Sequence, residues 1–119
     1  LVFKNYPLSF HANAQAAAEA SECAFDQDMF WEYHDTLFEN QDLLTSDYLV
    51  TVAEELGLDM DTFNTCLESD EKTAAVTEDM NAAASLGITG TPSFLVGDEL
   101  VVGAQSYDTI AGIIDAQLA

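Results

Sequence analysis

The sequence predicts an α/β fold in which one strand precedes a block of helices, and a β-hairpin and a last helix follow it. Two observations carry this prediction. Apolar residues recur with helical spacing through residues 11–86, and two short β-rich runs flank the turn pair Gly97-Asp98. With 119 residues, of which 49% are hydrophobic, the chain is long enough for one domain with a buried core.

The first element is a predicted strand over residues 1–8, which is apolar and is ended by Pro7. The chain starts without methionine and already reads as a strand at its first residues. No basic start followed by an apolar stretch and a cleavage site precedes this strand, so there is no signal-peptide pattern. We therefore expect these residues to be the downstream part of a longer protein.

Two helices are predicted next, over residues 11–25 and 28–38. The first is rich in alanine and places Ala16, Ala20 and Cys23 on one face. The second carries an apolar stripe made of Phe30, Trp31, His34, Leu37 and Phe38. We expect both stripes to face the core of the helical block.

The following helices are predicted from their end signals. Thr45 and Ser46 are N-cap candidates for a helix over residues 47–56, which Gly57 should stop. Asp59 can cap a short helix in which Cys66 shares a face with Met60, Phe63 and Leu67. Ser69 can cap a longer helix that reaches residue 86 before Gly87.

The last part of the chain holds a proline loop, a hairpin and a helix. Thr91-Pro92 leads directly into an apolar run, although proline is confined to the starts, edges and bulges of strands. Gly97-Asp98 is a two-residue hairpin turn signal. Ser106 can cap the last helix, and we expect that helix to turn four apolar residues inward: Tyr107, Ile110, Ile114 and Leu118.

The charge excludes several classes of partner. Two lysines stand against 22 acidic residues, which gives a formal net charge of −20. Phosphate binding needs Lys and Arg, so neither nucleic acid nor an anionic membrane surface is expected as a partner. No apolar run approaches the length of a membrane span, so we expect no membrane insertion by this chain. Acidic residues at this density are typical of halophilic proteins, which work in molar salt where charge repulsion is screened.

Cys23 and Cys66 are the only cysteines, and they do not form a Cys-x-x-Cys pair. An activated redox thiol lies close to a helix N-terminus, and neither position fits that pattern, so we expect no catalytic residue in this chain. Two interpretations stay open: two buried inert thiols, or a structural disulfide between two helices. A disulfide would favour an extracytoplasmic location; otherwise the compartment is unknown.

A metal site is not expected. His11 and His34 do not have the short spacing of structural zinc ligands relative to each other or to the cysteines. Asp26 and Asp28 lack the glycine and the final glutamate of a calcium loop. The residues give no reason to expect any cofactor, and Trp31 with Phe30 is expected to belong to the core.

Several stretches together resemble the DsbA-like thioredoxin family of disulfide oxidoreductases, in the branch that carries a helical insertion. The resemblance covers nearly the whole chain and rests on the order and spacing of its motifs. The matching stretches are residues 3–8 with His11, residues 14–17 running to Cys23-Ala24, residues 30–35 with Leu37-Phe38, Leu86-Gly87-Ile88-Thr89-Gly90-Thr91-Pro92-Ser93-Phe94, and Gly103-Ala104-Gln105.

The resemblance implies an incomplete thioredoxin-like fold. The helical insertion would occupy about residues 11–86, and the cis-proline loop, hairpin and last helix about residues 87–119. In this family a first strand and the catalytic Cys-x-x-Cys precede everything seen here. An unpaired sheet edge would then favour an edge-paired or swapped oligomer.

The resemblance also implies a function. Thr91 and Pro92 would bind the substrate backbone beside a redox pair that this chain lacks, and the peptide bond before Pro92 would be cis. The partners would be protein thiols or disulfides, and the chain would be part of a thiol-disulfide oxidoreductase, inactive alone. The alternative is a redox-inactive thioredoxin-like module that binds peptides or proteins.

Overall fold

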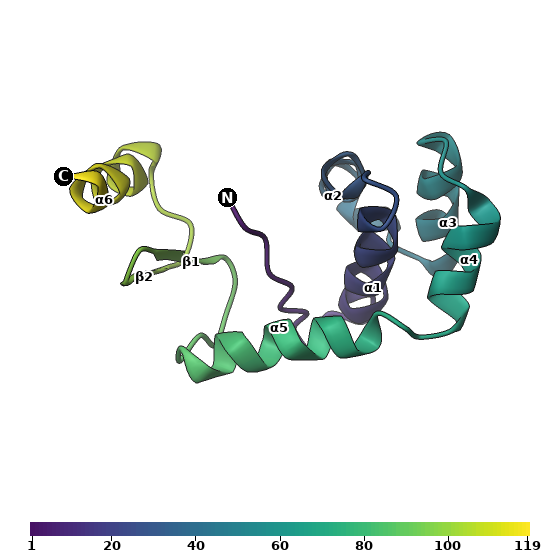
Figure 1. Cartoon of the computed structure of the whole chain (residues 1–119), viewed down its shortest axis with the longest axis horizontal. Helices are drawn as coiled ribbons and strands as arrows, with labels where there is room; N and C mark the ends of the chain where they lie inside the picture. Colours follow the sequence, from purple (N-terminus) through teal and green to yellow (C-terminus); the bar gives the residue numbers. More distant parts are fainter. The chain divides into compact units, whose positions relative to one another are not determined.

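The computed structural model describes all residues from 1 to 119 and is mostly helical, with one small sheet (Figure 1). The chain divides into two compact units, Leu1–Met80 and Asn81–Ala119. We call the first the helical unit and the second the hairpin unit, and we describe each by itself. No helix is both long enough and apolar enough to cross a membrane.

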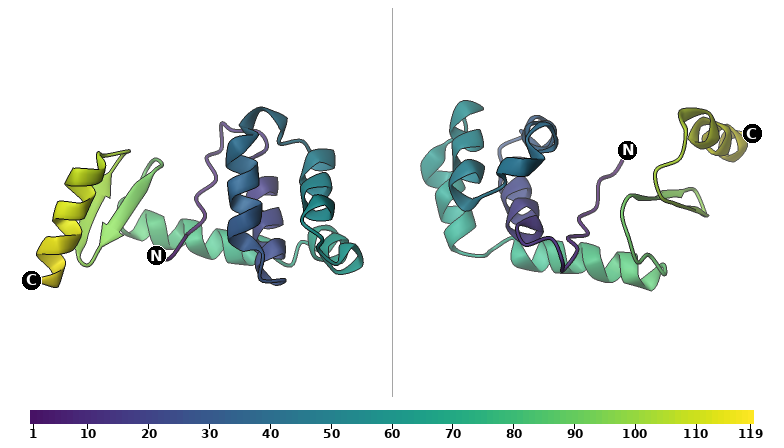
Figure 2. Two further views of the ribbon diagram at one scale, coloured as in Figure 1. Left: turned by 90° about the horizontal axis from the view of Figure 1, so that it is seen from above. Right: turned by 180° about the vertical axis from the view of Figure 1, so that it is seen from behind.

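The helical unit is organised around α1, which packs against α2, α3 and α4. Both views in Figure 2 show α1 and α2 side by side, and they show α3 beside α4. The elements of this unit are α1 (Ala14–Phe25), α2 (Phe30–Glu39), the short 3-10 helix η1 (Gln41–Leu43), α3 (Ser46–Glu55), α4 (Met60–Glu68) and the larger part of α5 (Thr73–Ser85).

The helices α1, α2, α3 and α4 share one hydrophobic core. Tyr33 and Phe63 are fully buried, and their ring centroids lie 5.9 Å apart. The phenol of Tyr33 donates a 2.7 Å hydrogen bond to the backbone carbonyl of Leu49, so the one polar atom of that ring has a partner inside the core. The remaining core residues are Ala20, Cys23, Ala24, Leu37, Leu49, Val52, Ala53, Leu58 and Cys66.

The predicted core stripes are confirmed in part. Cys66 and Phe63 are buried on one face of α4, with Met60 and Leu67 packed against the core as predicted. On α1 the buried face is Ala20, Cys23 and Ala24, whereas Ala16 is exposed. On α2 the inward face is Phe30, Tyr33 and Leu37, and the predicted members Trp31 and Phe38 are 42% and 59% exposed.

Three of the predicted helix ends are confirmed. The hydroxyl of Thr45 accepts a hydrogen bond from the backbone N–H of Tyr48, and α3 begins directly after it. Gly57 has φ of +77° where α3 stops, a conformation that glycine adopts without steric cost. The carboxylate of Asp59 accepts from the N–H of Thr62 at 3.0 Å and caps α4.

The prediction of a strand over residues 1–8 is wrong. These residues carry no regular secondary structure, and the only sheet of the structure contains β1 and β2. A strand exists only where a neighbouring strand completes its hydrogen bonds, and no backbone does so here. The segment is held by side chains instead: the backbone N–H of Asn5 donates to Asp79 Oδ2 at 3.0 Å, and Phe3 packs on Phe30.

Two predicted helix starts also need correction. The α2 helix begins at Phe30 instead of residue 28, because Asp28 has φ of +60° and lies outside helical space. Ser69 does not cap the next helix; it ends α4, where its hydroxyl donates to the backbone carbonyl of Cys66. Asp70 then takes φ of +55°, so α5 begins only at Thr73.

The hairpin unit contains β1 (Ser93–Val96), β2 (Glu99–Val102) and α6 (Tyr107–Leu118). The strands are antiparallel, with Val96 opposite Glu99 across the predicted turn at Gly97-Asp98. The hydroxyl of Ser106 caps α6 as predicted, by accepting from the N–H of Thr109. In Figure 2, α6 runs alongside the hairpin, and it packs against β1.

The predicted inward face of α6 is wrong for three of its four residues. Tyr107, Ile114 and Leu118 are 85%, 43% and 80% exposed. The half-buried residues are Ile110, which belongs to the predicted face, and Ala111 and Ile113, which do not. A hairpin of two four-residue strands covers only one narrow side of a twelve-residue helix, so most of its apolar surface stays open.

Candidate functional site

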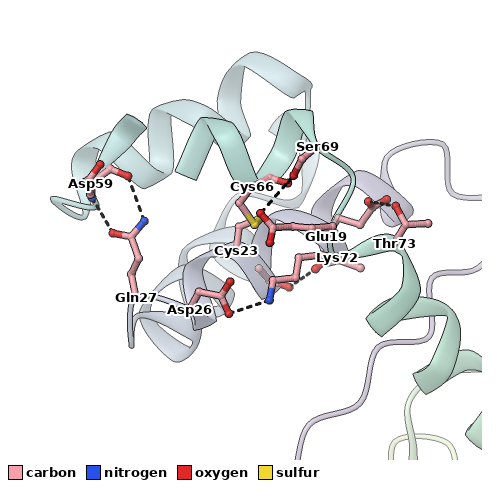
Figure 3. The surroundings of a disulfide bond; sticks show 12 residues. Glu19, Cys23, Asp26, Gln27, Asp59, Cys66, Ser69, Lys72 and Thr73 are labelled. Carbon is pink, nitrogen blue, oxygen red and sulfur yellow. Dashed lines mark hydrogen bonds and ion pairs between the residues drawn. A yellow bond between two sulfur atoms is a disulfide. The ribbon is translucent and has the colours of Figure 1, made fainter. Parts of the chain in front are cut away.

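Cys23 of α1 and Cys66 of α4 form a disulfide in the helical unit (Figure 3). The two sulfur atoms are 2.07 Å apart and the two Cα atoms 5.9 Å apart. The sequence left two interpretations open, buried thiols or a structural disulfide. The structure contains the disulfide and no free cysteine. It joins positions 43 residues apart in the chain.

Polar contacts surround the disulfide and join the same helices. The side-chain amide of Gln27 donates to the backbone carbonyl of Asp59, and its oxygen accepts from the N–H of Asp59 at 2.7 Å. Figure 3 shows Lys72 extending toward Asp26, where its ammonium lies 2.8 Å from the carboxylate. The hydroxyl of Thr73 donates to Glu19. The disulfide is therefore one of several links that tie α1 to the segment from α4 to α5.

The sulfur environment does not favour a reactive thiolate. Cys23 and Cys66 are 1% and 5% exposed, and each lies in the last turn of its helix. That end of a helix carries partial negative charge, whereas activated cysteines lie at the opposite end. A hollow of about 400 Å³ borders both cysteines, and its other lining residues are Asp26, Asp61, Thr62, Thr65 and Glu71. Carboxylates that line the same hollow further disfavour a negatively charged thiolate at either cysteine.

The disulfide is therefore a structural cross-link. Removing it frees a loop that spans 43 residues, which corresponds to about 4 kcal/mol of unfolding free energy in the chain-entropy description.

The second candidate site is the loop before β1 in the hairpin unit. The Thr91–Pro92 peptide bond is cis. Both residues are exposed, and the backbone carbonyl of Pro92 accepts from the N–H of Gly103 at 2.9 Å. The hydroxyl of Ser93 donates to the carbonyl of Gly90, which closes the loop from the other side. The backbone N–H and C=O of Thr91 make no hydrogen bond, so they are open to a partner.

The two histidines belong to aromatic contacts. His34 lies among Phe3, Phe30, Trp31 and Phe38, with its Nδ1 atom 2.9 Å from the neighbouring Asp35 carboxylate. The ring of His11 packs on Phe10. No three His, Cys, Asp or Glu side chains are arranged to hold a metal ion.

Asn5 has a structural role that the sequence analysis missed. It is buried, and its side-chain amide donates to Glu22 Oε1 at 2.7 Å and to Asp79 Oδ2 at 3.0 Å. This junction connects the first segment to α1 and α5. The sequence offers only a weak signal for this role, because Asn5 stands next to the charged Lys4 in an otherwise apolar segment.

The chain belongs to the DsbA-like thioredoxin domain family, whose model matches residues 3–115. A solved thioredoxin-like oxidoreductase from Silicibacter pomeroyi DSS-3 is 30% identical and superposes with a TM-score of 0.87. The match covers 100% of this chain and 69% of that one. The fold class is thus a DsbA-like thioredoxin fold that lacks part of the domain.

Two curated relatives show how much longer such proteins are. The chain is 34% identical over 119 residues to Na(+)/H(+) antiporter NhaA 3 of Salinispora tropica. The matched region covers 99% of this chain but only 18% of that protein. The chain is 28% identical to the probable disulfide bond formation protein D of Bacillus cereus, and it spans 57% of that protein's length.

Proposed function

We propose that these residues are the substrate-presenting part of a protein thiol-disulfide oxidoreductase. In this proposal the redox Cys-x-x-Cys pair lies outside the 119 residues, and the chain is one domain with a helical insertion at about residues 11–86 and a proline loop, hairpin and helix at about residues 87–119. Thr91 and Pro92 bind the peptide that carries the substrate cysteine.

The exposed backbone of Thr91 is the observation that carries the proposal. Its N–H and C=O are unpaired in the structure and stand immediately before β1. An extended peptide can satisfy both groups by lying antiparallel to this residue, in the way that a strand is added to a sheet edge. Backbone pairing of this kind accepts many sequences, which suits an enzyme that acts on protein thiols in general.

The chemistry supported is thiol-disulfide exchange. In disulfide formation a substrate thiolate attacks the disulfide of the redox pair, and in reduction a thiolate of the redox pair attacks the substrate disulfide; in both directions a mixed disulfide forms and a second thiolate resolves it. Thr91 contributes by holding the substrate backbone in register during these steps. Cys23 and Cys66 take no part in the exchange, because their disulfide is buried and lies in an acidic environment.

The test is an NMR titration of the 119-residue chain with a short extended peptide that contains one blocked cysteine. We expect the largest amide shifts at Thr91 and through β1, because these backbone groups are the proposed partners. Shifts confined to the helical unit would contradict the assignment. Insulin reduction is measured in parallel, and we expect no turnover by this chain and turnover by the native-length protein.

A second function is favoured by one specific observation: both cysteines of the chain are held in one buried disulfide. A redox-inactive module that binds peptides would keep the loop at Thr91 and need no further thiol. The two proposals differ in whether a redox Cys-x-x-Cys pair accompanies these 119 residues. Peptide binding at Thr91 without insulin turnover by the native-length protein would favour the binding module.

A further inference from the structure

A second hollow of the helical unit, with a volume of about 400 Å³, is walled by aromatic rings. Phe30 is buried and lies at the centre of this aromatic cluster. Its ring centroid is 5.1 Å from that of Phe3, 6.4 Å from that of Phe25 and 5.0 Å from that of Trp31. These three outer rings are 38%, 60% and 42% exposed, so aromatic surface stays open to a partner.

Carboxylates complete the wall of this aromatic hollow. Glu78 and Asp79 of α5 line it together with Glu22 of α1. Lys4 also lines it and lies 3.8 Å from Asp79, whereas no cationic side chain pairs with Glu22 or Glu78. Three carboxylates and one ammonium leave the wall with a net charge of about −2. The hollow therefore combines open aromatic rings with uncompensated negative charge.

We propose that the aromatic hollow binds a peptide segment that presents an arginine side chain between apolar residues. The guanidinium stacks on the open rings of Phe25 and Trp31 and donates hydrogen bonds to Glu78. The apolar neighbours pack on Leu1 and Val2, which line the same hollow and are exposed. All of the lining residues belong to the helical unit, and the inference does not depend on the proposed function.

The chemistry of the wall favours arginine over other occupants. A neutral apolar side chain would desolvate the carboxylates without pairing them, and an acidic one would be repelled. A lysine ammonium is more strongly hydrated than a guanidinium and has no planar face to lay on a ring. A second copy of this chain would bring another −20 of formal charge toward the same surface. Charge complementarity therefore points to a cationic partner.

The test uses the fluorescence of Trp31, which lines the hollow and is the only tryptophan of the chain. The chain is acetylated at Leu1, so that a terminal amine adds no positive charge beside the hollow. It is titrated at low ionic strength with acetyl-Leu-Arg-Leu-amide and with the same peptide carrying citrulline, which keeps the shape of arginine but is neutral. We expect the arginine peptide to bind at least about tenfold more tightly. N-acetylarginine amide should bind about tenfold more weakly than the arginine peptide, because it lacks the apolar neighbours.

Two pairs of matched variants locate the binding. Phe25 and Phe38 are 60% and 59% exposed, but only Phe25 lines the hollow. We expect Phe25→Leu to weaken binding of the arginine peptide about threefold and Phe38→Leu to leave it unchanged. In the same way, Glu78→Gln should weaken binding about threefold, whereas Glu54→Gln removes an exposed carboxylate of α3 outside the hollow and should have no effect. Melting curves confirm that each variant is folded.

Four results would overturn the proposal. Equal affinity for the arginine and citrulline peptides would show that the hollow does not select a cation. Equal affinity for N-acetylarginine amide and the arginine peptide would assign the hollow to a free cation instead of a peptide. Equal effects within either pair of variants would place the binding elsewhere on the chain. Trp31 emission that changes with the concentration of the chain alone would assign the hollow to a second copy.

Discussion

At the scale of single residues, Gly97 and Gly112 are predicted to respond in opposite ways to the same substitution. Gly97 has φ of +63° in the hairpin turn, a backbone conformation that strains any residue with a Cβ, whereas the nearby side chain of Gln117 is flexible and can move away. Gly112 lies in α6 with no atom near its missing Cβ. We expect Gly97→Ala to lower the unfolding free energy by more than about 1 kcal/mol, and Gly112→Ala to raise it by up to about 1 kcal/mol. Urea unfolding of both variants measures the difference.

Asp59 provides a second prediction at this scale. Hydrogen bonds from the backbone N–H and the side chain of Thr62 lower the pKa of the Asp59 carboxyl below its ordinary value. A lowered pKa in the folded state means that the stabilisation is present above the unfolded pKa and is lost as pH falls through the folded one. We expect Asp59→Ala to lower the melting temperature at pH 7, with Asp59→Asn retaining most of the cap. A wild-type melting temperature in Asp59→Ala would contradict this capping role.

At the scale of elements, α1 and α4 depend on their cross-link. The double variant Cys23→Ala, Cys66→Ala removes the bond and keeps small apolar side chains at both buried positions. We expect a loss of about 4 kcal/mol in unfolding free energy, which is a large part of the total for a small domain. Native-state hydrogen exchange should show the greatest loss of protection in α4. An unchanged urea midpoint would show that the other links between these helices suffice.

Elements with local signals were predictable from sequence, and elements that depend on distant partners were not. Thr45, Asp59 and Ser106 cap helices as predicted because a cap acts within three residues of its own position. The strand over residues 1–8 was wrong because a strand needs a second backbone that no local pattern reports. Ser69 was misassigned because it satisfies the end of α4 instead of the start of α5.

The same distinction between local signals and distant partners applies to the two candidate sites. The Thr91-Pro92 loop was visible because proline and its flanking glycines mark it in the sequence. Cys23 and Cys66 could be placed on inward faces, but their pairing depends on a three-dimensional distance. The hollow with Asp26, Asp61 and Glu71 joins three separate stretches of chain, and nothing in their local patterns predicted it.

At the scale of the whole molecule, the two-stranded sheet predicts self-association. The β1 and β2 strands pair only with each other, so each has one edge without a neighbouring strand. Exposed edges pair readily with other chains, and Leu95 and Val102 add apolar surface at 52% and 66% exposure. We expect the isolated 119-residue chain to form an edge-paired or swapped oligomer at high concentration. Sedimentation equilibrium that fits a monomer throughout would contradict this expectation.

The net charge of the whole molecule leads to a prediction about how its stability depends on salt. The formal net charge is −20, and both lysines are already engaged, Lys4 at 3.8 Å from Asp79 and Lys72 at 2.8 Å from Asp26. The other carboxylates have no cationic side chain to offset them, so their mutual repulsion opposes the compact state in dilute buffer. In molar KCl the Debye length falls from about 10 Å to about 3 Å, and the repulsion between neighbouring helices is screened.

The melting temperature should therefore rise steeply between about 0.1 M and about 1 M KCl, as expected of a halophilic protein. Sodium chloride should act equally at the same ionic strength, because screening does not depend on the identity of the cation. A melting temperature that stays flat or falls with added salt would exclude the halophilic interpretation.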